Sequence, residues 1–287
     1  MGNIEGFESL LAMVQKEMPL KKAGSAGDMW KKFLRIVFLG GGRGDAEIDY
    51  IIGLLKNETE LDFVLKTRGE QWQEAATERL DKAAAKEKDE RKSYAINSLK
   101  KELFRITASI KGSARYFERT KMSPETLEKL CKDRESTWEF IEELNDDEDV
   151  TNVRFTKVVL WLHSVGFAKD FCPPSRQIKD FVNKDLEFRY QFYDDDKFFM
   201  EKVREFAGKF PKASVYDVSK AIFFFRTLKN MLEPRSMEYR KFSPKAMLDF
   251  MKKNKFSLAD IGEILSDFDM RESLPEQLHK FLKTKGL

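Results

Sequence analysis

The chain has 287 residues, of which 35% are charged, and its formal net charge is +3. This length is enough for one large or two small domains with a buried core. The charge balance is mildly basic, far from that of a histone, so any contact with nucleic acid must come from a local basic patch. The two cysteines do not make a disulfide scaffold and favour a reducing, cytoplasmic compartment. With two histidines and no paired-cysteine spacing, no metal and no cofactor are expected.

Helical periodicity dominates the first half of the chain. The predicted helices cover residues 1–22, 28–39, 45–55, 60–80, 93–116, 123–131 and 136–145. The glycine run at residues 40–44 lacks the Gly-Lys-Ser/Thr ending of a phosphate-binding loop, so we interpret it as a helix end followed by a connector. The charge-rich residues 82–89 are expected to form an exposed helix face or a connector. Ser123 followed by Pro124 is typical of a helix N-cap with proline in the first turn.

Residues 150–190 are the most informative stretch. Lys157 stands at the start of a strongly apolar helical segment, which a Pro-Pro break and a second helical segment follow. The apolar segment is too short to span a membrane and is expected in the core. Burial lowers the pKa of an ammonium group, which can turn a lysine into a nucleophile. The alternative is that Lys157 extends along the surface to reach water.

The same stretch carries seven Lys or Arg residues against four Asp or Glu, so it is a local basic patch. The acidic run at residues 146–149, just before it, opposes that charge. Further helices are predicted at residues 195–206 and 214–232, with three short ones between residues 243 and 283. No alternating strand pattern is present. The predicted fold class is therefore all-α, in two lobes with a C-terminal helical extension.

Two motifs resemble a known enzyme family. Residues 156–178, TKVVLWLHSVGFAKDFCPPSRQI, resemble the helix-hairpin-helix DNA glycosylases, which carry a Thr-Lys or Gly-Lys pair, an apolar helix, a Gly-containing turn and a segment ending in a catalytic aspartate. Residues 66–76, KTRGEQWQEAA, resemble a Gly-Lys-Gly-Glu-Gln-Trp motif of the archaeal 8-oxoguanine DNA glycosylases. The resemblance covers about forty residues, and its motifs occur in the family's order. It implies a lobe of residues 1–59 plus 156–235, a second lobe of residues 60–155, an extension of residues 236–287, and substrate between the lobes. The four-cysteine iron–sulfur motif of many relatives is absent from this sequence.

The resemblance implies that Lys157 is the nucleophile that forms a Schiff base with the sugar. The position of the catalytic aspartate is occupied by Ser175, whose hydroxyl cannot supply a negative charge. Asp180 or Asp170, each five residues away, could take that role. The hairpin before the lysine has Asn152 where the family has glycine, and asparagine tolerates a left-handed conformation better than most residues.

For base recognition, Gln71 is expected to read a base edge and Trp72 to stack on a base face. Three further residues are candidates for the same cleft: Trp161, His163 and Phe167. For all of these, packing in the core or a surface position is the alternative. The residues expected to contact the DNA backbone are Asn152, Arg154, Lys169, Arg176 and Lys179, with a solvated helix face as the alternative.

The function expected from the resemblance is a DNA repair glycosylase and abasic-site lyase that acts on oxidised guanine in damaged duplex DNA. The first alternative is a glycosylase-like module, impaired in catalysis, that binds modified or distorted nucleic acid. The second is a helical adaptor for protein partners. We expect a monomer with no membrane association. The expected location is cytoplasmic, associated with the nucleoid in a prokaryote, or nuclear in a eukaryote.

Overall fold

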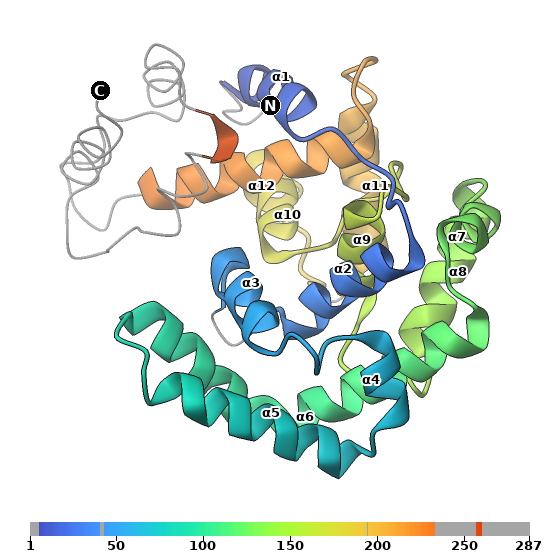
Figure 1. Cartoon of the computed structure of the whole chain (residues 1–287). Helices are drawn as coiled ribbons and strands as arrows, with labels where there is room; N and C mark the ends of the chain where they lie inside the picture. The colour runs from blue at the N-terminus through green and yellow to red at the C-terminus, as the bar shows by residue number, and fades with distance from the viewer. Residues whose placement is uncertain (1–5, 41–42, 194, 233–256, 260–287) are drawn as a thin grey trace. The chain divides into compact units, whose positions relative to one another are not determined.

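The computed structural model describes residues 6–40, 43–193, 195–232 and 257–259. Over these residues every regular element is helical, and the β pairing is limited to one isolated bridge between Gly40 and Arg43. The prediction of an all-α protein is therefore confirmed. Within the described part of the chain, no helix is both long enough and apolar enough to cross a membrane. Figure 1 shows the helices with their labels.

The chain divides into two compact units. The first unit contains residues 1–19 and 169–287, and the second contains residues 20–168. A discontinuous lobe was expected, but its boundaries differ from the expected residues 1–59 plus 156–235. The helices of residues 26–38 and 45–54 pack against that unit's longest helix, and the lysine helix packs against the helices of residues 26–38 and 134–146, so residues 20–59 and the lysine helix belong to the second unit. The expected C-terminal extension lies outside the described residues, apart from residues 257–259.

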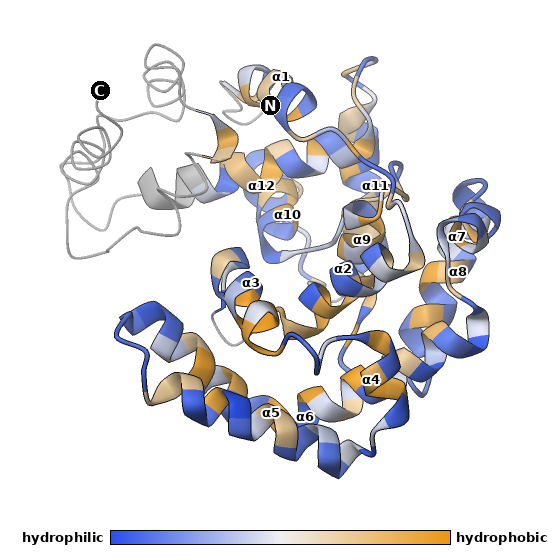
Figure 2. Cartoon of the chain, viewed as in Figure 1, coloured by the Kyte–Doolittle hydropathy of each residue, from blue (hydrophilic) through white to orange (hydrophobic). Residues whose placement is uncertain are grey.

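The second unit is built on one long helix, α6 (Glu90–Thr120). Four helices pack against it and precede it in the chain: α2 (Ala26–Phe38), α3 (Asp45–Leu54), α4 (Leu61–Lys66) and α5 (Gly69–Ala84). Three more follow it: α7 (Pro124–Leu130), α8 (Arg134–Asp146) and α9 (Phe155–Ser164). The neighbouring helix α5 lies alongside α6 in Figure 1, and Figure 2 shows hydrophilic and hydrophobic turns alternating along it, as expected for a helix with one buried face.

Local capping explains where these helices differ from the predicted ones. The predicted helix at residues 60–80 is split into α4 and α5 because Thr67 and Arg68 are extended, with ψ angles of 152° and 158°. The helix predicted at residues 93–116 is longer at both ends. Its start is fixed by Asp89, whose carboxylate accepts hydrogen bonds from the backbone N–H groups of Arg91 and Lys92. The N-cap predicted at Ser123 is confirmed, since its hydroxyl accepts a hydrogen bond from the N–H of Thr126 at 3.2 Å.

Aromatic rings hold α9 in the core of the second unit. The ring of Trp161 meets that of Phe33 edge to face with centroids 5.1 Å apart, and Phe33 meets Phe117 in the same way at 5.2 Å. These residues come from α9, α2 and α6, so the three helices share one packed centre. The indole N–H of Trp161 donates to the carbonyl of Met29 at 3.3 Å. Together these contacts fix the orientation of α9.

The first unit is organised around α12 (Val215–Leu232). Against it pack α1 (Phe7–Glu17), α10 (Arg176–Asp180) and α11 (Asp196–Ala207). The helix expected after the Pro-Pro break is the short α10, which continues as a π-helix over Phe181–Asp185. The rings of Phe7, Phe181 and Phe206 cluster in the core, with centroids 5.2–5.8 Å apart.

Candidate active site

The segment between α8 and α9 forms a tight hairpin that positions the start of α9. Asn152 has a φ of 61°, the left-handed conformation that asparagine tolerates better than most residues. Its side-chain amide donates to the hydroxyl oxygen of Ser109 on α6 at 2.7 Å. The hydroxyl of Ser109 also lies 3.2 Å from that of Thr151. The hairpin is thus attached to the middle of α6, and the first turn of α9 follows it directly.

A glycine in α6 allows the hairpin to approach closely. A Cβ added at Gly112 would collide with the backbone carbonyl of Asp149. Because the obstacle is backbone, it cannot move aside as a flexible side chain can. Gly112 costs helix propensity, and the close approach of the hairpin is the physical reason for its presence.

The acidic run before the lysine helix is neutralised by arginines of α6. The guanidinium of Arg115 lies 3.0 Å from the carboxylate of Asp149. Arg119 reaches Asp149 at 2.7 Å and Asp147 at 2.6 Å. These contacts lower the pKa of the Asp149 carboxyl, chiefly through the hydrogen bond from Arg115. Two of the four acidic charges expected to oppose the basic patch are therefore compensated within the second unit.

Lys157 is in the first turn of α9 and is half-buried. Its ammonium makes no hydrogen bond and no ion pair with any residue that the structure describes. Burial, with the charges of Arg105 and Arg43, lowers its pKa from 10.5 to about 8, against an opposing effect of Glu102. About one fifth of such lysines are neutral amines at pH 7.4, against about one in a thousand at the ordinary pKa.

The charges around Lys157 form a fixed cluster that we call the Arg–Glu–Arg cluster, made of Arg43, Glu102 and Arg105. Arg43 is buried, and its guanidinium donates to the carbonyl of Phe38 at 3.1 Å and to the Ser98 hydroxyl at 2.8 Å. The Glu102 carboxylate accepts from Arg43 and from Arg105, each at 2.9 Å. Both guanidinium groups donate to the same oxygen, Oε2, and the carboxylate forms no ion pair with Lys157.

The sequence analysis did not single out this cluster. Arg43 is the one charged residue inside the glycine run at residues 40–44. That isolation was the available signal, because a lone arginine in a connector has few local partners and must find them elsewhere in the fold. Its partners Ser98 and Glu102 lie 55 and 59 residues away in the chain, so no local pattern predicts the pairing.

The residues expected to recognise a base from the GEQW motif have structural contacts. Trp72 is fully buried, and its indole N–H donates to the carbonyl of Glu58 at 2.7 Å. The amide oxygen of Gln71 accepts from the backbone N–H of Arg68 at 3.0 Å and so caps α5. In this structure, Trp72 is a core residue and Gln71 an exposed cap, which matches the alternative given for each.

The other candidates for the cleft are also core residues. Trp161 packs between α2 and α6 as described above. His163 is buried with its Nε2 atom 3.1 Å from the carbonyl oxygen of Ala168. Phe167 is buried, and the ammonium of Lys22 lies 5.4 Å from its ring centroid. None of these three rings presents an exposed face for stacking.

The residues expected to contact the DNA backbone fall in both units. Asn152 and Arg154 are in the second, where Asn152 holds the hairpin and the Arg154 side chain is exposed. Lys169, Arg176 and Lys179 are in the first. Lys169 and Arg176 are exposed, whereas Lys179 is largely covered and pairs with Asp196 at 2.7 Å. Lys179 is thus engaged in a structural contact.

Ser175 and Asp180 belong to the first unit, whereas Lys157 belongs to the second. Ser175 is the N-cap residue of α10, and its hydroxyl does not cap the helix. Asp180 is buried and surrounded by cations, with Lys184 at 3.5 Å, Arg176 at 3.9 Å and Arg226 at 4.0 Å. The buried ion pair of Arg226 with Asp185 at 3.0 Å adjoins it. Asp180 therefore compensates local positive charge in the first unit.

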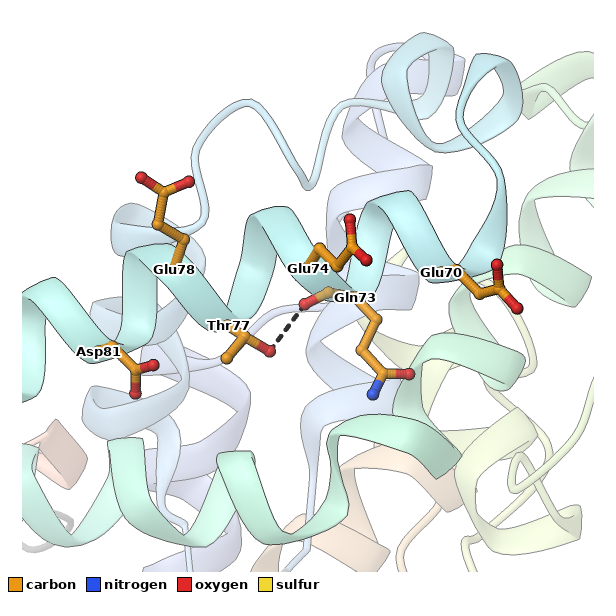
Figure 3. Close-up of a pocket in the computed structure, with 6 residues that line it drawn as sticks. All are labelled: Glu70, Gln73, Glu74, Thr77, Glu78 and Asp81. Atoms are coloured by element: carbon orange, nitrogen blue, oxygen red, sulfur yellow. Dashed lines mark hydrogen bonds between the residues drawn. The ribbon is translucent and has the colours of Figure 1, made fainter.

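A hollow of about 510 Å³ lies along α5 in the second unit. Figure 3 shows the residues that line it, Glu70, Gln73, Glu74, Thr77, Glu78 and Asp81, with the hydroxyl of Thr77 donating to the carbonyl of Gln73. Four of these six carry carboxylates, whose negative charges repel the phosphates of a nucleic acid. We therefore place no nucleic-acid contact in this hollow.

Comparison of the chain with protein-family models, with curated proteins and with solved structures found no match.

Proposed function

We propose that the protein is an abasic-site lyase of the DNA glycosylase type, acting on damaged duplex DNA through a Schiff base at Lys157. The observation that carries this proposal is the state of that side chain. It is a half-buried lysine with no hydrogen-bond or ion-pair partner among the described residues, and its pKa is lowered to about 8. A surface lysine that pairs with a carboxylate has neither property.

The chemistry requires a free amine. The Nζ atom of Lys157 attacks the C1′ aldehyde of an opened abasic sugar and gives a carbinolamine, which loses water to form the imine. The imine acidifies the C2′ proton. Its removal by a base breaks the C3′–O bond, and the strand is cut with the phosphate as leaving group. The Arg–Glu–Arg cluster supports the first step because it raises the fraction of neutral amine at pH 7.4.

Excision of an intact base is a harder step. It develops positive charge on the sugar, and the family places a carboxylate where this chain has Ser175. Asp180, the nearby alternative, is engaged with three cations. We therefore propose residual lyase activity with weak or undetectable excision of 8-oxoguanine. The lack of a catalytic carboxylate also favours the second candidate function, a module that binds distorted DNA without removing a base. In either case the protein acts as a monomer on DNA, in the cytoplasm of a prokaryote or the nucleus of a eukaryote.

The test is borohydride trapping on two duplexes, one with an abasic site and one with 8-oxoguanine. The unmodified protein is expected to be trapped on the first and scarcely on the second. Lys157→Ala removes the trapped product, and Ser175→Asp brings a modest gain on 8-oxoguanine, since a catalytic carboxylate must sit within about half an ångström of its productive place. Full excision by the unmodified protein would mean that another carboxylate has taken the role of the missing aspartate. No trapping on either duplex would leave only the binding module.

A further inference from the structure

An exposed face of α6 leads from its N-terminal part to the hairpin. We call it the α6 strip, and its exposed residues are Tyr94, Asn97, Lys101, Phe104, Arg105 and Ala108. They recur at intervals of three, four and seven residues, which places them on one side of a helix. The side chain of Phe104 is 80% exposed and that of Tyr94 is 57% exposed. Phe104 makes no ring or cation contact with any described residue.

The strip has one sign of charge. Lys101 and Arg105 are its two ionisable cations, and its six residues include no carboxylate. The nearest acidic residue in the chain, Glu102, is occupied by Arg43 and Arg105. An isolated exposed aromatic ring needs no explanation. An aromatic ring set between two cations on a face without anions fits a ligand that is both flat and negatively charged.

The strip also leads to the proposed site. Arg105, directly after Phe104, acts electrostatically on Lys157. One turn further on, Ser109 binds the hairpin through Asn152. A ligand that lies on the strip is therefore close to the start of α9, where Lys157 projects.

We propose that the α6 strip binds a nucleic-acid strand and that Phe104 stacks on an unpaired base next to the sugar that Lys157 attacks. This inference rests on the proposed function, because it assigns the unpaired base of the DNA substrate to the α6 strip. Every base presents a flat face, so the contact is tolerant of sequence. The cations of the strip contact the flanking phosphates and position the strand without reading it.

The experiment measures the affinity of the full-length protein for a fluorescent oligonucleotide that carries a tetrahydrofuran abasic analogue. This analogue has no aldehyde, so binding is read without any reaction at Lys157. Phe104→Ala is expected to weaken binding by roughly 5- to 150-fold, the effect of losing one base–aromatic stack. Phe104→Trp keeps the affinity, and binding of the oligonucleotide quenches the fluorescence of the new indole. Phe223→Ala, which removes an exposed aromatic ring from the first unit, leaves the affinity unchanged.

The outcomes separate this inference from the proposed function. If Phe104→Ala binds as tightly as the unmodified protein, the strip is not a stacking surface, even where Lys157 is still trapped on abasic DNA. If Phe104→Ala loses affinity while the unmodified protein is not trapped on abasic DNA, the strip is a stacking surface and the proposed lyase activity is refuted. Self-association that disappears in Phe104→Ala, without any oligonucleotide binding, would assign the strip to a second copy of the chain and overturn the inference. Because the Phe104 ring is exposed, Phe104→Ala should fold normally, which its unfolding temperature checks.

Discussion

Removing Arg105 should make Lys157 a poorer nucleophile at neutral pH. The Arg105 guanidinium is the largest of the charges that lower the pKa of Lys157, second only to burial. It also occupies the carboxylate of Glu102 at 2.9 Å. Arg105→Gln therefore removes a repulsion and one of the two cations that neutralise the Glu102 carboxylate, which can attract the ammonium. Both changes stabilise the charged form of Lys157.

The size of the effect follows from the charges. Two unit charges a few ångströms apart interact by about 1 kcal/mol in water and by about 4 kcal/mol near a protein surface. More than half of the Arg105 side chain is exposed, so we take a value near the lower end, about 1.4 kcal/mol, which lowers the ratio of amine to ammonium tenfold. At pH 7.4 the amine fraction then falls from about one fifth to about one fortieth, an eightfold loss of reactive species. At pH 10 both proteins are almost entirely in the amine form, so the difference disappears.

The assay is reductive alkylation of Lys157 by a small aldehyde, followed by peptide mass spectrometry, between pH 6 and 10 and without DNA. Arg105→Gln should react about eightfold more slowly at pH 7.4 and equally fast at pH 10. Lys101→Gln is the matched control, since it removes a cation from the same face of α6 that is not among the charges acting on Lys157. Equal rates for all three proteins at pH 7.4 would refute the reasoning, as would an equal loss in Lys101→Gln.

Three further predictions concern stability. Gly112→Ala should destabilise the protein by about 1–3 kcal/mol in a denaturant titration, because its Cβ collides with the carbonyl of Asp149; an unchanged midpoint would contradict the close approach. Trp72→Phe should cost about 1–3 kcal/mol, since it leaves the carbonyl of Glu58 without its buried donor, and thermal unfolding measures this. Lys157→Met should stabilise the protein at pH 7 by on the order of 2 kcal/mol after allowance for solvent screening. The folded-state pKa of Lys157 is lowered, so the charged form costs stability below pH 8, and the gain in Lys157→Met should shrink as the pH rises from about 8 to 10.5.

Periodicity and capping residues were sufficient to predict the helical class. The helix start at Ser123 was placed correctly, because its hydroxyl is the N-cap acceptor and a proline follows it. The split between α4 and α5 was missed because its cause is a backbone change at Thr67 and Arg68, neither of which is a strong helix breaker. The length of α6 was underestimated because the charged residues before it conceal an Asp89 cap.

The boundaries of the two units could not be read from the sequence. The expected boundary followed the order of motifs in the resembling family. The observed one follows packing, because α9 shares aromatic contacts with α2 and α6. Ring contacts between residues far apart in the chain, such as Phe33 and Trp161, leave no local pattern in a sequence.

At the candidate site, the sequence identified the lysine but not its surroundings. Half-burial and a lowered pKa at Lys157 were expected from the apolar residues after it, and both are present. Trp72 and Trp161 were proposed to bind a base because a motif cannot distinguish a buried ring from an exposed one. Phe104 went unnoticed for the same reason: its exposure depends on which face of α6 the other helices cover.

The central claim is that Lys157 is the nucleophile, and the most direct measurement is the identity of the residue that carries the trapped sugar. After borohydride reduction on abasic DNA, the cross-linked protein is digested with protease and nuclease, and the modified peptide is sequenced by mass spectrometry. The account predicts the sugar remnant on Lys157, with a yield that rises steeply with pH up to about 8 and then levels off. A remnant on another lysine, or an undiminished yield in Lys157→Ala, would contradict it.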